Sequence, residues 1–213
     1  MSRLRMQLSI SLDGFVAGPN QTAEDPIGKN GLRLHDWVFG LKAWRRQHGM
    51  EGGEDNASTV CVEEATANVG AVLMGRNMFG PVRGSWEASA PWDGWWGETP
   101  PYHCPVFVLT HHARAPLVMK GGTTFHFVTG GPEAALAEAR RVAGEKDVSI
   151  AGGASLARQV LAAGVVDEVE LHLAPLLLGS GERLFDGGMT DLHGLTLVRT
   201  IAAPGVTHLK FSR

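Results

Sequence analysis

The stretch VSIAGGASL at residues 148–156 constrains the fold more than any other feature of this chain. Its β-branched and apolar residues predict a short buried strand, and its second half predicts the start of a helix. Between them, Gly152 and Gly153 keep the end of the strand free of side chains. The free N–H groups at the start of such a helix suit an anion, for example a pyrophosphate. A glycine pair before a helix is also common as an ordinary turn. The residues at the other strand ends therefore decide whether a ligand site is predicted.

Strand and helix patterns alternate through the middle of the chain, and two strands close it. Strands are predicted at residues 4–12, 71–74, 105–110, 123–128, 148–151, 167–174, 195–201 and 206–211, and helices at 32–48, 58–68, 132–142 and 154–163. The last two strands flank Pro204-Gly205 and read as an antiparallel pair. The pattern predicts an α/β fold with one mostly parallel sheet of eight strands, an antiparallel C-terminal edge and helices on both faces. With neither a repeat nor a linker in the sequence, we expect a single domain over residues 1–213.

Composition narrows the function classes. The net charge of −3 gives no basic footprint for nucleic acid, and no apolar run approaches the roughly 20 residues that span a bilayer. The N-terminus, MSRLRMQLSI, lacks the apolar core of a signal peptide. Cys61 and Cys104 are too few for a zinc cluster and are expected to be reduced thiols rather than a disulfide, and the histidines lack metal-ligand spacing. We therefore expect a cytoplasmic protein without a metal site.

The residues that follow the predicted strands gather glycines with polar or basic side chains. In open α/β sheets, ligands bind at the carboxyl ends of the strands. Arg76 could pair with a phosphate through two hydrogen bonds, and Thr110 with His111 could meet a 2′-phosphate or an adenine edge. Each of these residues alone is more often an ordinary surface or loop residue, but their joint occurrence favours a dinucleotide site. Because the chain has no GxGxxG fingerprint, separate loops would hold the phosphates.

Five motifs in order give the chain a family resemblance. They are SLDGFVAG (11–18), LMGRNMF (73–79), PVFVLTH (105–111), IAGGASLARQVL (150–161) and PLLLGSGERLF (175–185). Together they resemble the dihydrofolate reductase-like superfamily, in the branch related to the reductase domain of the bifunctional riboflavin-biosynthesis deaminase–reductase. The resemblance covers nearly the whole chain, with residues 20–68 least characteristic. It implies a twisted eight-stranded sheet and the cofactor NADPH.

The resemblance also implies a set of residues around NADPH, from its adenosine end to its nicotinamide end. The set comprises Gly75, Arg76 and Asn77 at the pyrophosphate and adenosine side, Thr110 and His111 at the adenosine ribose and 2′-phosphate, Gly152, Gly153, Ala154, Ser155 and Leu156 around the pyrophosphate, Val16 and Ala17 at the nicotinamide ribose, and Gly179 and Gly181 at the nicotinamide end.

Two departures from relatives limit the activity. The chain has no HxE…PCxxC zinc signature, so it lacks the deaminase half of the bifunctional enzyme. Folate reductases hold the pterin with an acidic helix residue, and Asp36 lies in the corresponding region, but its context LHDWVFG matches poorly. Dihydrofolate is therefore not the expected substrate.

Candidates for the chemistry come from the first turn and from the tryptophans. Asp13 is the first choice for a polar anchor or proton relay, with an Asx-turn as the alternative, and Ser11 could donate to a substrate carbonyl or simply face the turn. Phe15 and Trp37 are the candidates for substrate contact, although core packing would also explain Trp37. The four tryptophans at 86, 92, 95 and 96 could form a lid over a planar ring, or cover the core or a subunit interface.

The favoured function is an NADPH-dependent reductase that transfers a hydride to a small planar heterocycle, such as a pterin- or pyrimidine-like ring. The alternative is a nucleotide-binding protein of the same fold with little or no turnover. The apolar C-terminal strands and the tryptophan-rich segment also suggest a homodimer.

Overall fold

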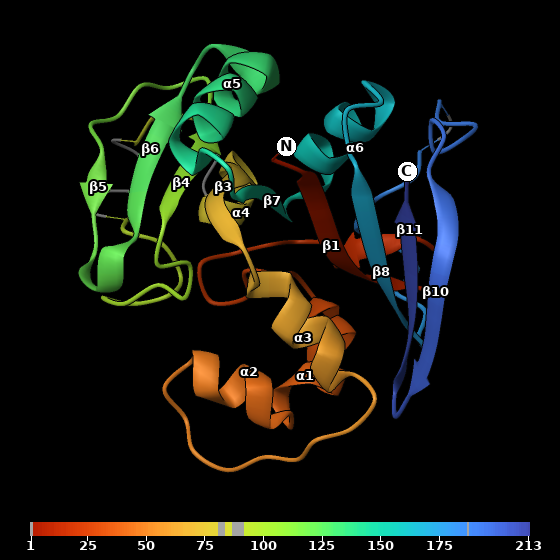
Figure 1. Cartoon of the computed structure of the whole chain (residues 1–213). Helices are drawn as coiled ribbons and strands as arrows, with labels where there is room; N and C mark the ends of the chain where they lie inside the picture. Colours follow the sequence, from red (N-terminus) through yellow and green to blue (C-terminus); the bar gives the residue numbers. More distant parts are fainter. Residues whose placement is uncertain (1, 81–83, 87–91, 187) are drawn as a thin grey trace.

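A nine-stranded sheet forms the frame of the molecule (Figure 1). The structure is a computed structural model and describes residues 2–80, 84–86, 92–186 and 188–213. In spatial order the strands are β10 (Thr196–Ala203), β11 (Val206–Ser212), β8 (Glu168–Ala174), β1 (Leu4–Ser11), β7 (Asp147–Gly152), β3 (Val69–Gly75), β4 (Pro105–Leu109), β6 (Thr124–Val128) and β5 (Leu117–Val118).

Pairing is parallel from β8 to β6, and antiparallel at both edges of the sheet. The mostly parallel sheet with an antiparallel C-terminal edge is thus confirmed. The ninth strand, β5, is only two residues long, which is too short to give a sequence pattern. A separate ribbon pairs β2 (Phe15–Ala17) with β9 (Glu182–Arg183) and joins the segments 11–18 and 175–185.

Two helices cover one face of the sheet. They are α5 (Gly131–Ala143) and α6 (Ala154–Ala162), which pack on β3, β4 and β7 and lie together in Figure 1. Alternation along β1 and β7 directs Leu4, Met6 and Ile150 to this face, where all three are almost completely buried. Among the described helices, none is long and apolar enough to cross a membrane.

The opposite face is divided between two coverings. Over β3, β4 and β6, Phe79 from the short helix α4 (Arg76–Phe79) packs edge-on against Phe125 at 5.0 Å. Over β1, β8 and β11 lie η1 (Gly31–His35), α1 (Asp36–Phe39), α2 (Lys42–Gln47) and α3 (Thr59–Thr66). Trp37 of α1 donates to Ser9 of β1, and Ser58, just before α3, is hydrogen-bonded to His208 of β11. Helices therefore cover both faces, as the sequence predicts.

The single helix predicted at 32–48 is wrong, because this segment contains η1, α1 and α2 in succession. Gly40 ends α1, and Leu41 then takes an extended backbone with φ −76° and ψ 132°. That break buries Leu41 completely beneath the helices. The apolar residues of this segment do have the spacing of a helix, but the extended backbone at Leu41 interrupts it.

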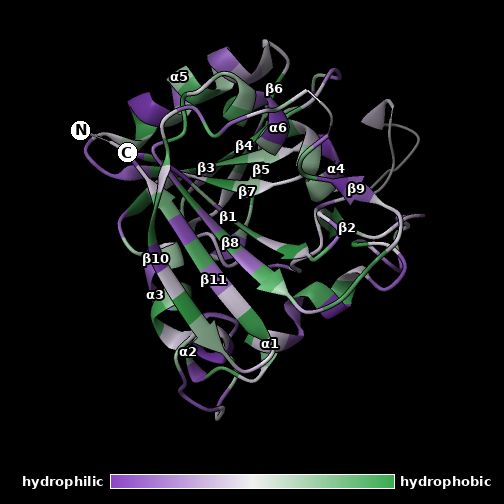
Figure 2. Cartoon of the chain, turned by 90° about the vertical axis from the view of Figure 1, so that its right-hand side faces the viewer, coloured by the Kyte–Doolittle hydropathy of each residue, from purple (hydrophilic) through white to green (hydrophobic). Residues whose placement is uncertain are grey.

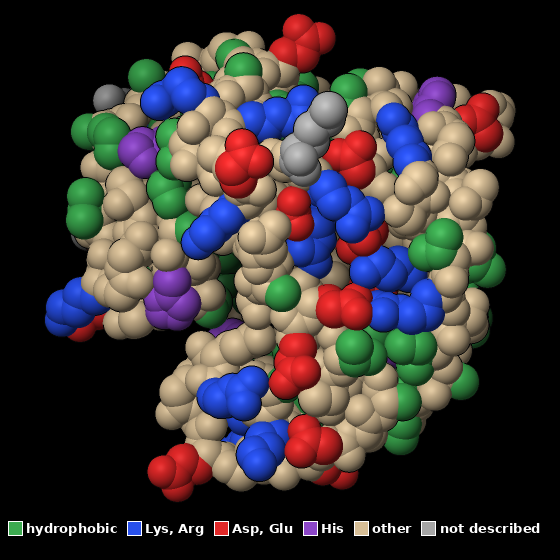
Figure 3. All heavy atoms as spheres, viewed as in Figure 1, with side chains coloured by type: hydrophobic (Ala, Val, Ile, Leu, Met, Phe, Trp, Pro, Cys, Tyr) green, Lys and Arg blue, Asp and Glu red, His purple; other side chains and the backbone are tan. Residues whose placement is uncertain are grey.

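Beneath α3 the sheet carries charge instead of an apolar layer. Glu64 of α3 receives two hydrogen bonds from Arg199, at 2.7 and 2.6 Å, and one from Lys210 at 2.9 Å. The fully buried Glu170 also accepts from Arg199, at 3.1 Å. Figure 2 shows β8 and β11 changing between hydrophilic and hydrophobic along their length, and Figure 3 shows acidic and basic side chains intermixed on one face. This network ties α3 to the C-terminal edge of the sheet.

The network makes stability depend on pH through Glu64. Hydrogen bonds from Arg199 lower the pKa of its carboxyl from 4.5 to about 2, with Lys210 adding to the effect and burial opposing it. A carboxyl with a lowered pKa stabilises the fold above its unfolded-state pKa, and the contribution is lost as the pH falls towards the folded-state value.

We therefore expect Glu64→Gln to lower the free energy of unfolding by roughly 1–2 kcal/mol at pH 7, because the carboxylate is partly exposed. The difference from wild type should shrink between about pH 4.5 and about pH 2. Urea denaturation across this range measures the difference. Glu63→Gln is the matched control, because the single ion pair of Glu63, with Arg46 at 3.5 Å, is exposed on both sides and should contribute little. Equal losses in both variants would contradict this role of Glu64.

Candidate functional site

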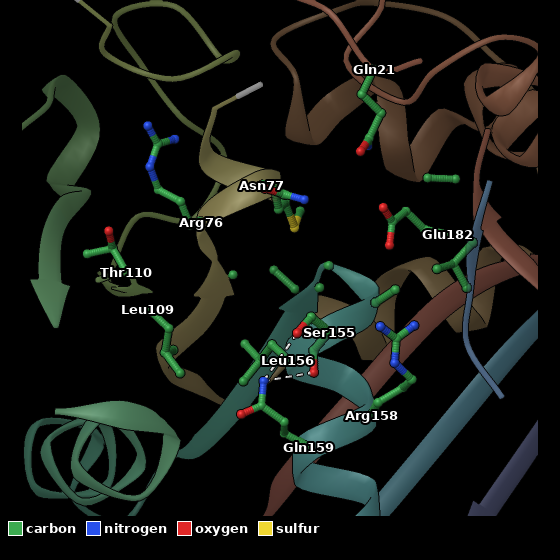
Figure 4. A pocket seen from close by; sticks show the side chains of 18 of the residues that line it. Gln21, Arg76, Asn77, Leu109, Thr110, Ser155, Leu156, Arg158, Gln159 and Glu182 are labelled. Atoms are coloured by element: carbon green, nitrogen blue, oxygen red, sulfur yellow. Dashed lines mark hydrogen bonds between the residues drawn. The ribbon is translucent and has the colours of Figure 1, made fainter. Parts of the chain in front are cut away.

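A cleft of about 760 Å³ opens at the carboxyl ends of the parallel strands (Figure 4). Its walls include the ends of β3, β4, β6 and β7, at Gly75, Thr110, Thr129 and Gly152. Parallel pairing brings these ends to one edge of the sheet, which is where ligands bind in open α/β folds. In Figure 4, Arg76 and Thr110 lie on one side, α6 contributes Ser155 and Arg158, and Gln21 and Glu182 lie on another side.

Twelve of the residues expected around the cofactor line this cleft. They are Val16, Ala17, Gly75, Arg76, Asn77, Thr110, His111, Gly152, Gly153, Ala154, Ser155 and Leu156. Gly181 lines a neighbouring cavity of about 340 Å³, which shares Gln21, Asn77 and Glu182 with the cleft. The described lining of the two cavities does not include Gly179, Ser11, Asp13, Phe15 or Trp37.

The glycine pair forms a bare backbone surface at the start of α6. Gly153 precedes the helix, and its carbonyl accepts from Ala157 N–H at 3.1 Å, so the N–H groups of Ala154, Ser155 and Leu156 lie before the first intrahelical bond. A Cβ atom built on Gly153 would meet nothing within 4 Å. The peptide bond between Gly152 and Gly153 is cis. This surface can therefore admit an anion directly onto backbone donors.

Arg76 brings a partly buried cation to the same cleft. Its guanidinium lies 3.7 Å from the ring centre of Trp86, and its Nη1 donates to the Gly80 carbonyl at 3.2 Å. Its Nε and Nη2 atoms are buried without a hydrogen-bond partner in the part of the chain that the structure describes. Burial, together with the nearby Arg114, lowers the pKa of Arg76 to about 10. Arg76 lines the cleft, and its two unpaired donors make this part of the cleft suitable for an anionic group.

The cleft also meets a polar row that crosses three neighbouring strands. Ser9 of β1 lines the cleft and is aligned with His172 of β8, which is aligned with His208 of β11. The two imidazoles join through their Nδ1 atoms at 2.7 Å, and His208 Nε2 lies 2.9 Å from the hydroxyl of Ser58. Burial lowers the pKa of His172 to about 3, with His208 and His35 adding to the effect, and burial also lowers the pKa of His208 to about 4. Both rings are therefore neutral near pH 7.

Trp37 packs on this row. Its ring centre lies 4.8 Å from that of His172 and 4.9 Å from that of His208, and its Nε1 donates to Ser9 Oγ at 3.2 Å. The residue thus touches the cleft through Ser9, and its expected contact with substrate stays a prediction. Phe15 lies in β2 with Arg183 over its ring at 4.5 Å.

Asp13 joins two distant turns. Its carboxylate accepts from Ser11 Oγ at 2.5 Å and from the N–H groups of Leu178 and Gly179 at 3.1 and 2.7 Å. Burial alone would raise the pKa of Asp13, but these hydrogen bonds outweigh it and lower the pKa to about 2. Ser11 in turn accepts from Phe15 N–H at 2.9 Å. The contacts describe a brace between the β1–β2 turn and the loop before β9, and a catalytic role for Asp13 and Ser11 stays a prediction.

The described tryptophans cover the core, which is one of the roles that the sequence left open, and the lid stays a prediction. Trp92 and Trp95 donate from Nε1 to the carbonyls of Phe79 and Met78, at 2.7 and 2.9 Å, and Trp96 stacks on Phe125 at 5.8 Å. They thus cover the second face of the sheet. Trp95 and Trp96 also line the cleft, while residues 87–91 of this segment lie outside the described residues.

Sequence reasoning missed several lining residues. His35, Gln21, Arg158 and Glu182 were not singled out, although all four line the cleft. Gln21 and His35 belong to the segment with the weakest pattern, residues 20–68. Arg158 lies in the motif 150–161, and its position one turn after Ser155 on α6 could have identified it.

An α/β sheet with a cleft at the carboxyl ends of its parallel strands defines the class: an α/β fold with its candidate ligand site at that edge of the sheet. The profile of the RibD C-terminal domain matches residues 3–208, and the chain belongs to this family. The family contains the reductase domains of riboflavin biosynthesis.

Solved structures support the same fold at low sequence identity. A protein from Shewanella sp. PV-4, named as a candidate riboflavin biosynthesis protein, has 20% identity and a TM-score of 0.63, with 99% of this chain and 98% of that chain covered. Acinetobacter baumannii RibD has 18% identity and a TM-score of 0.55, covering 100% of this chain and 58% of that one.

A third similar structure is a diaminohydroxyphosphoribosylaminopyrimidine deaminase/5-amino-6-(5-phosphoribosylamino)uracil reductase from Thermotoga maritima. It has 13% identity and a TM-score of 0.57, with 99% of this chain and 56% of that chain covered. The chain thus spans little more than half of the Acinetobacter and Thermotoga proteins. No curated protein matches the sequence.

The contacts of Asp13 lead to a test that separates bracing from catalysis. We expect Asp13→Asn to lower the free energy of unfolding by about 1 kcal/mol, because an amide cannot accept from both N–H groups as a carboxylate does. Urea denaturation measures the loss, and Glu24→Gln, which changes an exposed carboxyl in the same way, is the control. If Asp13→Asn kept the stability of the wild type but lost its activity, a catalytic role of Asp13 would be favoured instead.

Proposed function

We propose that this chain is an NADPH-dependent reductase that transfers a hydride to a small planar heterocycle of the pterin or pyrimidine type. The observation that carries the proposal is the joint placement of the Gly152-Gly153 surface, the α6 start and Arg76 around one cleft. Its volume of about 760 Å³ falls in the range of cofactor and ligand sites. When bound, NADPH supplies the hydride, and the chain supplies binding, orientation and exclusion of water.

The described residues fit such a cofactor along the length of the cleft. The pyrophosphate would meet the N–H groups of Ala154, Ser155 and Leu156, where no Cβ of Gly153 obstructs it. The unused donors of Arg76, with Thr110 and His111 in the same wall, would meet the adenosine end and its 2′-phosphate. These three side chains are the reason for proposing NADPH, which carries a 2′-phosphate, rather than NADH, which does not.

The nicotinamide end would lie towards β2. Val16 and Ala17 line the cleft there, and the turn before β9 brings Gly181 to the adjoining cavity. The N–H of Gly179 is already bonded to Asp13, so this glycine would shape the loop rather than bind. The pyrimidine class is supported by the name of the Thermotoga protein, which is a reductase of a substituted uracil.

A second function, nucleotide binding with little turnover, is favoured by one observation. Both candidates for the chemistry, Asp13 and Ser11, are held in the brace and are absent from the described lining of the cleft. A protein built in this way could retain the cofactor while lacking a group that completes the reaction.

Titration with NADPH, followed by quenching of tryptophan fluorescence, separates these functions. We expect saturable binding that is at least 10-fold tighter for NADPH than for NADH, because one charged hydrogen bond is worth about 1.5–3 kcal/mol. Loss of nicotinamide absorbance with a panel of pterin and pyrimidine oxidants then reports turnover. Binding without turnover on any oxidant would favour the second function, and the absence of binding would contradict both.

The bare backbone at Gly153 gives a sharper test. We expect Gly153→Val to weaken NADPH binding by at least 10-fold, because its side chain would occupy space that is open in the structure. Gly40→Val is the matched control, since Gly40 is equally unobstructed but ends α1, outside the described lining of the cleft. Thermal melting confirms that both variants fold. Equal affinities for the two variants would exclude the pyrophosphate from this surface.

A further inference from the structure

We propose that His35 binds the substrate at the inner end of the cleft, as a neutral imidazole that donates Nε2–H to a carbonyl oxygen of the substrate ring. The inference rests on the proposed reductase function and narrows its substrate class. The ring would present a carbonyl, as a pteridine-dione or a pyrimidine-dione does, rather than an amidine edge that pairs with a carboxylate.

The first argument is the position of the ring. His35 is the last residue of η1 and directly precedes α1, and it lines the cleft together with Ser9, Pro26 and Ile27. These residues come from β1, η1 and the loop before η1, whereas the Gly152-Gly153 surface lies between β7 and α6 and Arg76 begins α4. We call the part of the cleft lined by His35, Ser9, Pro26 and Ile27 its inner end, and none of these four residues belongs to the set proposed for the cofactor phosphates.

The second argument is the unequal surroundings of the two ring nitrogens. Nδ1 of His35 is buried and has no hydrogen-bond partner within the described ranges. Nε2 is not among the buried atoms without a partner, and none of the described residues hydrogen-bonds to it, so Nε2 is the ring nitrogen with exposed surface in a residue that lines the cleft. A buried N–H without an acceptor is rarer and more costly than a buried acceptor without a donor. The proton of the neutral ring therefore belongs on Nε2, which makes this atom a donor into the cleft.

The third argument is charge. Burial lowers the pKa of His35, and the adjacent Asp36 opposes this only in part. On the sheet side, His172 of β8 is the titratable group that interacts with His35, and its own pKa of about 3 keeps it neutral. A neutral donor suits an uncharged carbonyl oxygen, which needs a hydrogen bond and no counter-ion.

The fourth argument concerns carboxylates. In the described lining of the cleft the acidic residue is Glu182, which lies in β9 and faces the region of Gln21 in Figure 4. Asp36, the acidic residue nearest to the expected pterin-binding position, is exposed and does not belong to that lining. A pterin that is bound through its protonated amidine edge needs a carboxylate as partner. The inner end of the cleft offers the imidazole of His35 instead, which suits a carbonyl.

Fluorescent pteridines test the inference on the protein without cofactor. Lumazine, which is pteridine-2,4-dione, presents two carbonyls, and 2,4-diaminopteridine presents amino groups at the same ring positions. We expect wild type to bind lumazine about 10-fold more tightly than the diamino compound, the effect of one hydrogen bond. Equal or reversed affinities, or no lumazine binding, would overturn the carbonyl class.

Two substitutions test whether lumazine binding depends on Nε2 of His35. His35→Phe keeps a ring but removes the donor, and we expect it to weaken lumazine binding about 10-fold. His35→Gln retains an N–H close to the position of Nε2, and should stay within about 3-fold of wild type. Lumazine affinity unchanged in His35→Phe would overturn the role of His35. NADPH affinity, measured on the same samples, bears only on the proposed reductase function, so the two failures are distinguishable.

The tautomer has its own readout. In protein labelled with ¹⁵N-histidine, the His35 signal, assigned by its absence from His35→Gln, should show the Nε2–H tautomer at neutral pH. Addition of lumazine should shift Nε2 more than Nδ1. A protonated Nδ1, or a charged ring at neutral pH, would contradict the proposal.

Discussion

Parallel pairing of β3, β4, β6 and β7 is the constraint on which the rest of the structure depends. Strands that run in the same direction end at the same edge, so residues far apart in sequence, such as Arg76, Thr110 and Gly153, reach one cleft. Each crossover must return along a face of the sheet, which places the start of α6 at that edge as well. The bare glycines, the backbone donors and the guanidinium converge for this single topological reason.

The face of the sheet opposite α5 and α6 places buried polar side chains next to the cleft. Over β1, β8 and β11 this face buries the polar side chains of His172, His208 and Glu170, and each buried polar group must find a partner. The polar row begins at Ser9 in the cleft and ends at Ser58 at the start of α3. Hence η1 and α1–α3 act as more than a cover, because they fix the imidazole and indole rings next to the inner end of the cleft.

Local patterns predicted the parts of this structure that local chemistry determines. Alternating apolar residues identified long strands, and the motifs at the strand ends identified twelve of the residues that line the cleft, because strand ends and turns are encoded within a few residues. The brace at Asp13 could not be predicted, since its partners Leu178 and Gly179 are 165 and 166 residues away. The histidine row depends on strand register, and the break at Leu41 depends on burial beneath the helices. Neither leaves a signature in a short window of sequence.

The central claim is that the Gly152-Gly153 surface and the start of α6 hold the pyrophosphate of NADPH. A crystal structure of the protein with NADP⁺ tests it most directly. The account predicts pyrophosphate oxygens within about 3 Å of the N–H groups of Ala154, Ser155 or Leu156, with the 2′-phosphate on the side of Arg76 and Thr110. A nucleotide bound elsewhere, or bound in the cleft with its pyrophosphate away from α6, would contradict it.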